Sequence, residues 1–215
     1  MRAAKGGIFL NRIITVGRQF GSGGRELGKR LADELGCPYY DKDIIREIAA
    51  RTQLAESYIQ QILEHRPNYF FPITIGRTLH NTAPDYLLHQ HTSVYTEQVN
   101  TIREMAEKSD CVIVGRCADH ILREFKPFRL FVYADMDSRM ERCRKKAPED
   151  EALTDKELKK KILRVDRNRA KYYRYYTGHV WGRPANYDFC INTSWVNLKA
   201  AAHALAHMIT EEPQP

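Results

Sequence analysis

Three glycines within four residues mark the part of the chain where phosphate chemistry is expected. Residues 16–27 read VGRQFGSGGREL, a short apolar run followed by the loop Gly21, Ser22, Gly23, Gly24, Arg25 and Glu26. Glycine allows positive φ angles and a close approach of ligand to backbone. The N–H groups of such a loop, with the free N–H groups of a following helix, bind anions. The loop therefore predicts a phosphate-binding cradle, for which a plain strand-to-helix turn is the simpler alternative.

Two known phosphate-binding patterns compete for this loop. The dinucleotide pattern GxGxxG matches at Gly21 and Gly23 but meets Glu26 at its third glycine. Asp41 lies at about the separation expected of the ribose-binding acid of that pattern. The P-loop pattern GxxxxGK[ST] lacks both its lysine and its hydroxyl residue, since Gly24 follows Gly23. The loop alone predicts phosphate binding and leaves the class of site open.

A run of cations between residues 160 and 174 recurs at spacings of four, three, four and three residues. On a helix this spacing places all of them on one face. Like charges at such spacings destabilise a helix by roughly 0.2–0.5 kcal/mol per pair. The stripe therefore predicts contact with a polyanion, and a solvated face relieved by nearby acids is the alternative. The stripe consists of Lys160, Arg164, Arg167, Lys171 and Arg174.

Other residues that could do chemistry are assigned structural roles. Tyr172, Tyr173, Tyr175 and Tyr176 follow the stripe. Aromatics among cations can stack on nucleic-acid bases, but packing within the domain is the preferred interpretation. His203 and His207 share a helical face without the glutamate of the metalloprotease motif, and His89 and His91 have no acids at ligand spacing. The five cysteines, which have no CxxC pair, are expected to be free thiols of a reducing compartment.

Alternating apolar strands and amphipathic helices predict how the chain positions these residues. Strands are expected at 12–17, 38–40, 111–114, 130–133 and 189–191. Helices are expected from the glycine loop to Leu35 and at 85–108, 136–146, 155–176 and 196–209. Such alternation predicts an α/β fold with a parallel sheet covered on both faces. Arg116 follows the strand at 111–114, so it is expected at the carboxyl edge of the sheet, where ligands bind in such folds.

Length and charge limit the classes of protein. The 215 residues suit one domain (1–215), with the irregular stretch 66–84 inside it. The formal net charge of +7 favours anionic partners. Apolar runs such as Ile8–Leu10 are too short for a signal peptide or membrane span, so a cytoplasmic protein without a membrane partner is expected.

Three blocks together resemble the cytidylate kinase-like family of P-loop kinases. They read GRQFGSGGRELGKRLADELGCPYYDKDII, VIVGRCAD and RVDRNRA, in that order and at matching spacing. The likeness extends over most of 13–209 and is weak at about 54–109. It implies a three-layer α/β/α fold with a parallel five-stranded sheet, an acceptor segment at about 41–109 and a helical lid at about 142–177. ATP and Mg²⁺ are the implied donor and cofactor.

The resemblance also assigns roles to single residues. Such kinases carry the phosphate-loop lysine where this chain has Gly24 and a magnesium-binding threonine where it has Glu26. Arg25 is the expected replacement cation, with Lys29 or Arg18 as alternatives, and Glu26 is expected to hold the metal through water. The family's GRD triplet is Gly115-Arg116-Cys117 here. The implied acceptor-binding residues are Asp41, Arg46, Arg116, Asp119 and Asp166, and the implied lid cations are Arg164, Arg167 and Arg169.

The expected function is transfer of a phosphoryl group from ATP to a nucleoside monophosphate, CMP-like or dCMP-like, or a related small acceptor. In this interpretation, residues 192–195 lie beside the adenine. Two other hypotheses stay open: a nucleotide sensor without catalysis, which the missing lysine would explain, and a basic RNA-binding module. Nucleic acid is not expected as the main partner, and the sequence leaves the oligomeric state undetermined.

Overall fold

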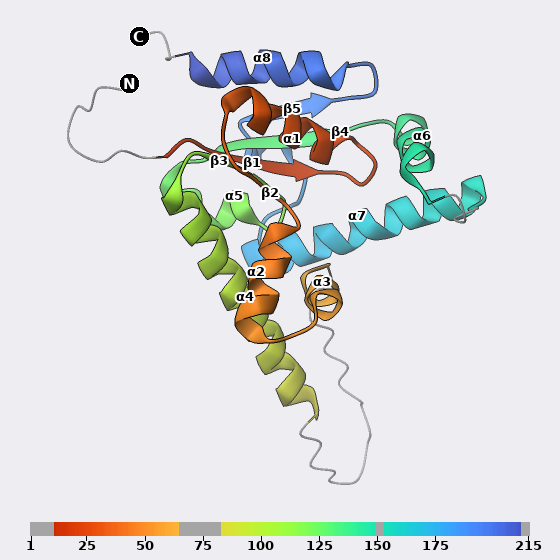
Figure 1. Cartoon of the computed structure of the whole chain (residues 1–215). Coiled ribbons are helices and arrows are strands. Elements are labelled where there is room, and N and C mark those ends of the chain that lie inside the picture. Colours follow the sequence, from red (N-terminus) through yellow and green to blue (C-terminus); the bar gives the residue numbers. More distant parts are fainter. Residues whose placement is uncertain (1–10, 65–82, 149–152, 212–215) are drawn as a thin grey trace, which may run out of the picture.

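A parallel sheet of five strands forms the centre of the computed structural model, which describes residues 11–64, 83–148 and 153–211 (Figure 1). The order across the sheet is β2-β3-β1-β4-β5, and each neighbouring pair is parallel. All five carboxyl ends therefore meet at one edge, where ligands bind in folds of this type. The strands are β1 (Ile13–Arg18), β2 (Tyr39–Tyr40), β3 (Cys111–Val114), β4 (Phe128–Tyr133) and β5 (Phe189–Asn192).

Two helices cover one face of the sheet. These are α1 (Gly24–Leu35) and α8 (Leu198–Thr210), which pack against each other and lie above the sheet in Figure 1. Alternate residues of the central strands, such as Ile14 and Val16, point into this layer and meet Leu27 and Leu31. The four-residue spacing of these leucines thus positions α1, and with it the glycine loop that precedes it.

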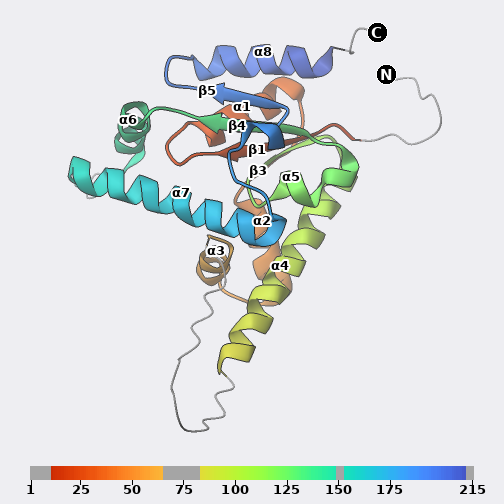
Figure 2. The same cartoon turned by 180° about the vertical axis from the view of Figure 1, so that it is seen from behind.

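The opposite face is covered by α2 (Asp43–Thr52), α3 (Glu56–Glu64), α4 (Ala83–Lys108), the short α5 (Ala118–Ile121) and part of α7 (Asp155–Thr177). Ile13, Cys111 and Ile113 point into this second apolar layer, where Tyr172 and Tyr173 of α7 are buried. Seen from behind, α7 crosses below the sheet and α4 extends away from it (Figure 2). Burial of these two tyrosines confirms their expected packing role.

The remaining helix, α6 (Met136–Lys146), lies beside the sheet and packs against the first half of α7. A small apolar cluster of Met140, Leu158 and Ile162 joins the two helices, and Phe20 of the glycine loop packs against it. The loop is thereby held between the sheet and the α6–α7 pair. None of the described helices is long and apolar enough to span a lipid bilayer.

The predicted α/β/α architecture with a parallel five-stranded sheet is confirmed. Every predicted strand and helix is present, with bounds shifted by one or two residues, and Cys111–Val114 and Met136–Lys146 agree at both ends. The helices α2, α3 and α5 were not predicted. Most of the stretch 66–84 lies outside the described residues, and α4 begins at its end, at Ala83.

Candidate functional site

The glycine loop connects the carboxyl end of β1 to α1 and has the backbone geometry of an anion cradle. Gly21 and Gly23 have φ angles of 77° and 81°, in the left-handed region that favours glycine. Ser22 between them is buried, and its Oγ donates a hydrogen bond to the Gln19 carbonyl at 2.9 Å. The Ser22 carbonyl accepts one at 2.6 Å from the hydroxyl of Thr193, which follows β5. The loop is therefore fixed by bonds to its neighbours.

A cavity of about 270 Å³ lies against this loop, between α1, α6 and the first half of α7. Gly21, Gly23 and Gly24 form part of its wall. Seven cationic side chains and one carboxylate, that of Glu26, also line it. Such an excess of positive charge in a concave site favours an anion of high charge. The cations are Arg18, Arg25, Arg142, Arg144, Lys146, Lys161 and Arg169.

Glu26, the residue predicted to hold a metal through water, lies in the first turn of α1 beside this cavity. Its carboxylate accepts hydrogen bonds from Arg30 at 3.1 Å and from Lys146 at 3.2 Å. Partial burial raises the pKa of Glu26, but these two bonds outweigh burial and the net pKa is lowered. The group is thus an ionised carboxylate that already has two cationic partners. No cluster of three or more potential metal ligands occurs among the described residues.

Asp41, at the end of β2, is the acid around which several arginines gather. Its carboxylate lies 2.8 Å from Nε of Arg25 and 3.6 Å from a terminal nitrogen of Arg18. Arg116 and Arg169 are close enough to lower the pKa of Arg18 further, after the larger effect of burial. The structure therefore brings together predicted residues from the loop, the acceptor side and α7. Asp41 pairs with Arg18 and Arg25, and Arg116 and Arg169 are further cations near Arg18, so positive charge is in excess around Arg18. Arg169 also lies 3.6 Å from the carboxylate of Asp166.

The turn after β3 places Arg116 at the predicted edge of the sheet in an unusual conformation. Gly115, Arg116 and Cys117 have successive φ angles of 73°, 59° and 56°. Left-handed geometry at non-glycine residues costs about 1–3 kcal/mol each and is concentrated at functional sites. The buried Gln98 of α4 supports the turn by donating a hydrogen bond to the Arg116 carbonyl at 3.0 Å.

Asp119 follows this turn, in the first residues of α5. Its carboxylate accepts a 2.6 Å hydrogen bond from the Tyr173 hydroxyl. Burial raises the pKa of Asp119, and the bond from Tyr173 offsets only part of that effect. A second, smaller pocket of about 60 Å³ lies here, lined by Arg116, Asp119, Tyr173 and other residues. Arg18 and Arg169 line both this pocket and the larger cavity, so they form the boundary between the two.

Asp166 and Arg46, both predicted to bind the acceptor, have protein partners here. Asp166 accepts a 2.8 Å hydrogen bond from the Phe20 N–H and is ion-paired with the buried Arg139. Arg139 also donates to the Phe20 carbonyl at 2.7 Å, so Asp166 fixes the loop from outside it. Arg46 is exposed on α2, where it pairs with Asp43 at 2.9 Å. Neither residue lines the cavity or the smaller pocket.

The three predicted lid arginines lie on different sides of α7. Arg169 faces inward, donates to the Arg18 carbonyl at 3.2 Å and has its guanidinium 5.6 Å from the centre of the Phe20 ring. Arg164 and Arg167 are exposed and do not line the cavity. They belong to the cationic stripe, all five members of which are exposed. The structure therefore brings Arg169 to the site but not Arg164 or Arg167.

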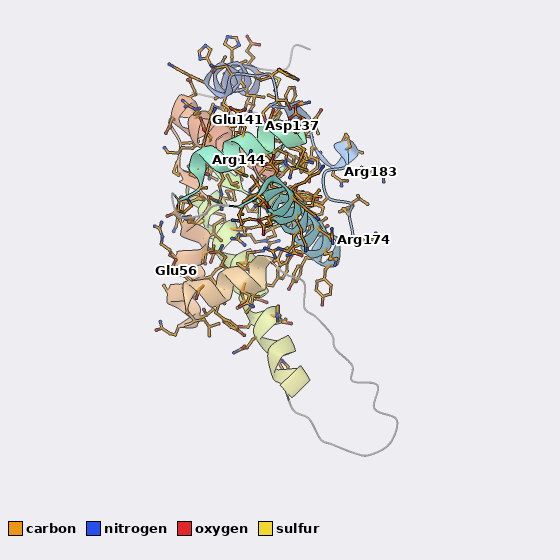
Figure 3. All side chains as sticks on the ribbon, turned by 90° about the vertical axis from the view of Figure 1, so that its right-hand side faces the viewer. Glu56, Asp137, Glu141, Arg144, Arg174 and Arg183 are labelled. Carbon is orange, nitrogen blue, oxygen red and sulfur yellow. The ribbon has the colours of Figure 1, made fainter. Side chains whose placement is uncertain are left out.

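Figure 3 views α7 nearly end-on with α6 above it, and it labels Arg174 of the stripe together with residues of α6. The exposed surface of α6 mixes both signs of charge, because Asp137 and Glu141 accompany Arg144. The exposed face of α7 beyond Glu157 carries only cations among its charged residues.

Sequence reasoning missed four cations of the cavity, Arg142, Arg144, Lys146 and Lys161, and gave Arg18 only as an alternative. Arg142 donates to the Thr193 carbonyl at 2.6 Å and so joins α6 to the segment after β5. Lys161 extends from the inner side of α7, one residue from the predicted stripe. Arg18 is the last residue of β1, where the strand's apolar pattern hides it. Only the position of Arg18 beside the loop is a signal in the sequence; the other four cations are brought to the cavity by the packing of α6 and α7.

The parallel sheet, its strand order and the glycine loop between β1 and α1 define a P-loop kinase fold. Solved structures agree. An uncharacterized protein from Eubacterium ventriosum is 25% identical, with a TM-score of 0.67, 94% of this chain covered and 99% of that one. Shikimate kinase from Bacteroides thetaiotaomicron is 16% identical, with a TM-score of 0.55 and coverage of 92% and 98%. TT1252 from Thermus thermophilus is also 16% identical, with a TM-score of 0.53 and coverage of 95% and 99%.

The sequence decides the family within this fold. The model of the cytidylate kinase-like family matches residues 13–195, which include the loop, the Gly115–Cys117 turn and α7. No curated protein matches the sequence. The chain belongs to the cytidylate kinase-like family, as its three sequence blocks predicted.

Proposed function

We propose that this protein transfers the terminal phosphoryl group of ATP to a nucleoside monophosphate, CMP-like or dCMP-like, or to a related small acceptor. The observation that carries the proposal is the cavity over the glycine loop, where seven cations face one carboxylate. None of the five cysteines of the chain forms a disulfide bond, which supports work in the reducing cytoplasm.

On the donor side, the loop from Gly21 to Glu26 would bind the phosphates of ATP. The fit is supported by the left-handed Gly21 and Gly23 and by the basic walls of the cavity. Arg25 would offset charge on the β- and γ-phosphates. Residues 192–195 would lie beside the adenine, because Thr193 is hydrogen-bonded to Ser22 of the loop and Trp195, two residues further on, is 92% exposed.

Mg²⁺ would reach the site together with the nucleotide, because this ion keeps several waters and is bound largely through phosphates in such sites. When bound, it neutralises charge that develops on the phosphate oxygens. Glu26 is the carboxylate that lines the cavity and is the residue proposed to approach the ion through water. In that role one of the Glu26 oxygens would accept a hydrogen bond from a metal-bound water beside the bonds from Arg30 and Lys146.

On the acceptor side, Arg116 and Asp119 would hold the phosphate and the polar groups of the acceptor in the smaller pocket. Asp41 would orient Arg25 and Arg18 toward both substrates, as its ion pairs support. Arg46 and Asp166 are weaker candidates, because a contact with the acceptor requires each to leave its present partners.

The transfer step would depend on alignment and positive charge, since phosphoryl transfer passes through a loose transition state that needs little covalent help. Arg169 already lies at the boundary between the two pockets. Arg164 and Arg167 would contribute only if α7 turned about its axis, because they lie about 140° and about 160° around the helix from Arg169. Their role stays a prediction.

A nucleotide sensor without catalysis is the second candidate, and the absence of any side chain at Gly24 favours it. A panel of nucleoside triphosphates and monophosphates, with and without Mg²⁺, separates the candidates by melting temperature and by phosphoryl transfer. The proposal expects stabilisation by ATP, further stabilisation by one monophosphate, and formation of ADP. Stabilisation by ATP without transfer to any monophosphate would make the protein a sensor. Stabilisation by oligonucleotides alone would favour the RNA-binding hypothesis.

A further inference from the structure

Arg18 occupies a position that its place at the end of a strand does not suggest. Its side chain is only 11% exposed and lies among Asp41, Arg25, Arg116 and Arg169. It lines the cavity on the side of the glycine loop and also the smaller pocket on the side of Arg116. Arg25 lines only the larger cavity, and its side chain is 52% exposed. Arg18 is thus the loop-proximal cation that reaches both pockets.

Two glycines make room for this side chain. A Cβ atom on Gly24 would lie 2.5 Å from Cβ of Arg18, and one on Gly115 would lie 1.6 Å from a terminal nitrogen of Arg18. Real Cβ atoms do not approach other atoms so closely. Any side chain at position 24 would therefore collide with the base of the Arg18 side chain. Position 24 directly follows Gly23, where the general P-loop pattern has its lysine.

The charge around Arg18 is not balanced within the protein. Burial lowers the pKa of Arg18, Arg169 lowers it further, and Asp41 opposes both. The carboxylate of Asp41 is closer to Arg25, at 2.8 Å, than to Arg18, at 3.6 Å. Nε of Arg18 is buried without a hydrogen-bond partner among the described residues. An oxyanion bound to this guanidinium group would neutralise part of the excess positive charge, because a guanidinium group matches phosphate in a two-pronged geometry.

We propose that Arg18 replaces the missing phosphate-loop lysine and binds the phosphoryl group of ATP that is transferred, at the boundary between the two pockets. The inference rests on the proposed function and makes it more specific. A lysine at position 24 and an arginine at position 18 exclude each other in space. The loss of a side chain at position 24 and the presence of Arg18 are therefore physically linked. Asp41 is then a positioning residue that holds Arg18 and Arg25 before the nucleotide binds.

The first test compares Arg18→Met with Arg25→Met and Lys145→Met. Lys145 is an exposed cation of α6 that does not line the cavity. Calorimetry measures affinity for ATP and for ADP, because contact with the terminal phosphoryl group affects ATP alone. We expect Arg18→Met to reduce the preference for ATP over ADP by about 10-fold to 100-fold, the value of one charge-assisted hydrogen bond or a strong pair. Lys145→Met should keep the preference, and Arg25→Met should weaken the binding of both nucleotides.

Turnover gives the second readout. Loss of Arg18 should lower kcat by about 10²-fold to 10³-fold, as loss of a preorganised transition-state donor does. The melting temperature of Arg18→Met should not fall, because the substitution removes one positive charge from a region with excess positive charge and leaves Asp41 paired with Arg25. Arg18→Lys keeps the charge but loses the two-pronged geometry, so it should recover part of the lost turnover.

The sharpest test restores the general loop. Gly24→Lys alone should lose activity or fold poorly, because its Cβ has no room beside Arg18. The double variant Arg18→Gly with Gly24→Lys removes the Cβ atom that blocks position 24, so it should regain turnover relative to either single variant. An unchanged ATP-over-ADP preference in folded Arg18→Met would overturn the role of Arg18, even if wild-type protein transfers phosphoryl groups. Loss of that preference in a protein without transfer would support the Arg18 contact and reject the proposed function instead.

Discussion

At the residue scale, the site supplies its cations from positions other than those of the general motif. The loop has no lysine, yet Arg18 and Arg25 pair with Asp41, and Arg169 lies near Arg18. Burial of Arg18 in this excess of positive charge lowers the stability of the empty protein, because little solvent screens the repulsion. Such a cost is typical of sites that are complementary to an anionic ligand and not to the empty state.

At Asp119, a similar cost in stability can be measured from the pH dependence of Tm. Burial raises its pKa above the ordinary value of 3.8, so the ionised carboxylate destabilises the folded protein. The stabilisation from the protonated group is complete below that value and is lost as the pH rises through the folded-state pKa. Asp119→Asn, which resembles the protonated group, should therefore raise Tm at pH 7, by about 2–4 °C for each kcal/mol recovered. The gain should disappear near pH 3.5, and affinity for the acceptor should fall.

Asp188 is the matched control, because its pKa is shifted in the opposite direction. Hydrogen bonds from Arg129 outweigh the effect of burial and lower the pKa of Asp188. Its stabilisation is present at neutral pH and lost as the pH falls, so Asp188→Asn should lower Tm at pH 7 and matter less in acid. Melting curves of both variants between pH 3.5 and pH 7 check the two opposite directions in which the change in Tm depends on pH. A gain for Asp119→Asn that persists at low pH would contradict the assignment to ionisation.

At the scale of elements, the sequence was sufficient for the strands and for most helices. Apolar β-branched runs and leucine spacing depend on burial against the sheet, and burial is what these patterns report. The helices α2, α3 and α5 were missed because the segment from 41 to 64 lacks strong caps and Ala118–Ile121 is a single turn. The inward cations Arg142 and Lys161 could not be predicted, since the rotation of α6 and α7 about their axes is set by packing around Phe20.

The junction of β1, the loop and α1 is tested by a substitution with a matched glycine. Gly23→Val should prevent ATP binding, because a branched side chain obstructs the cradle and resists a φ of 81°. Gly36, at the other end of α1, also has a positive φ, of 63°, but nothing lies within 4 Å of its Cβ position. Gly36→Val should thus cost similar stability, on the order of 1–3 kcal/mol, and leave ATP affinity unchanged.

Binding isotherms for ATP and melting curves of both variants separate strain from obstruction. Equal losses of ATP affinity in the two variants would mean that general destabilisation explains the effect. ATP affinity close to wild type in folded Gly23→Val would mean that this loop is not the phosphate-binding cradle.

At the scale of the whole molecule, positive charge is distributed over two separate regions. One is the cavity between the loop and the inner side of α7, and the other is the exposed stripe on the outer side of the same helix. Together they account for much of the net charge of +7. From the sequence, Arg164 and Arg167 of the stripe were predicted to belong to a lid. The structure divides the two regions, because Leu158, Ile162 and Tyr172 bury the inner side of α7 and fix its rotation.

Arg167→Ala and Arg169→Gln compare the two regions on one helix. Arg169 lines both pockets, so its loss should lower turnover by about 10²-fold or more, as expected for a charge aimed at the transition state. Arg167 is exposed within a row of like charges. Its loss should change turnover much less, and Tm should stay equal or rise slightly as repulsion in the stripe is relieved.

Salt-dependent binding of a single-stranded oligonucleotide completes the comparison. A protein that acts on small nucleotides should show the same salt slope in wild type and in Arg167→Ala. If the stripe binds nucleic-acid phosphates, the slope should instead fall by about one unit in the variant, since each contact releases about one counterion. A loss of turnover in Arg167→Ala as large as that in Arg169→Gln would mean that α7 turns during the reaction and that its outer face closes over the phosphoryl group. Such a rotation must break the hydrogen bond between Asp166 and the Phe20 N–H. In that case, Asp166→Ala should change turnover as well.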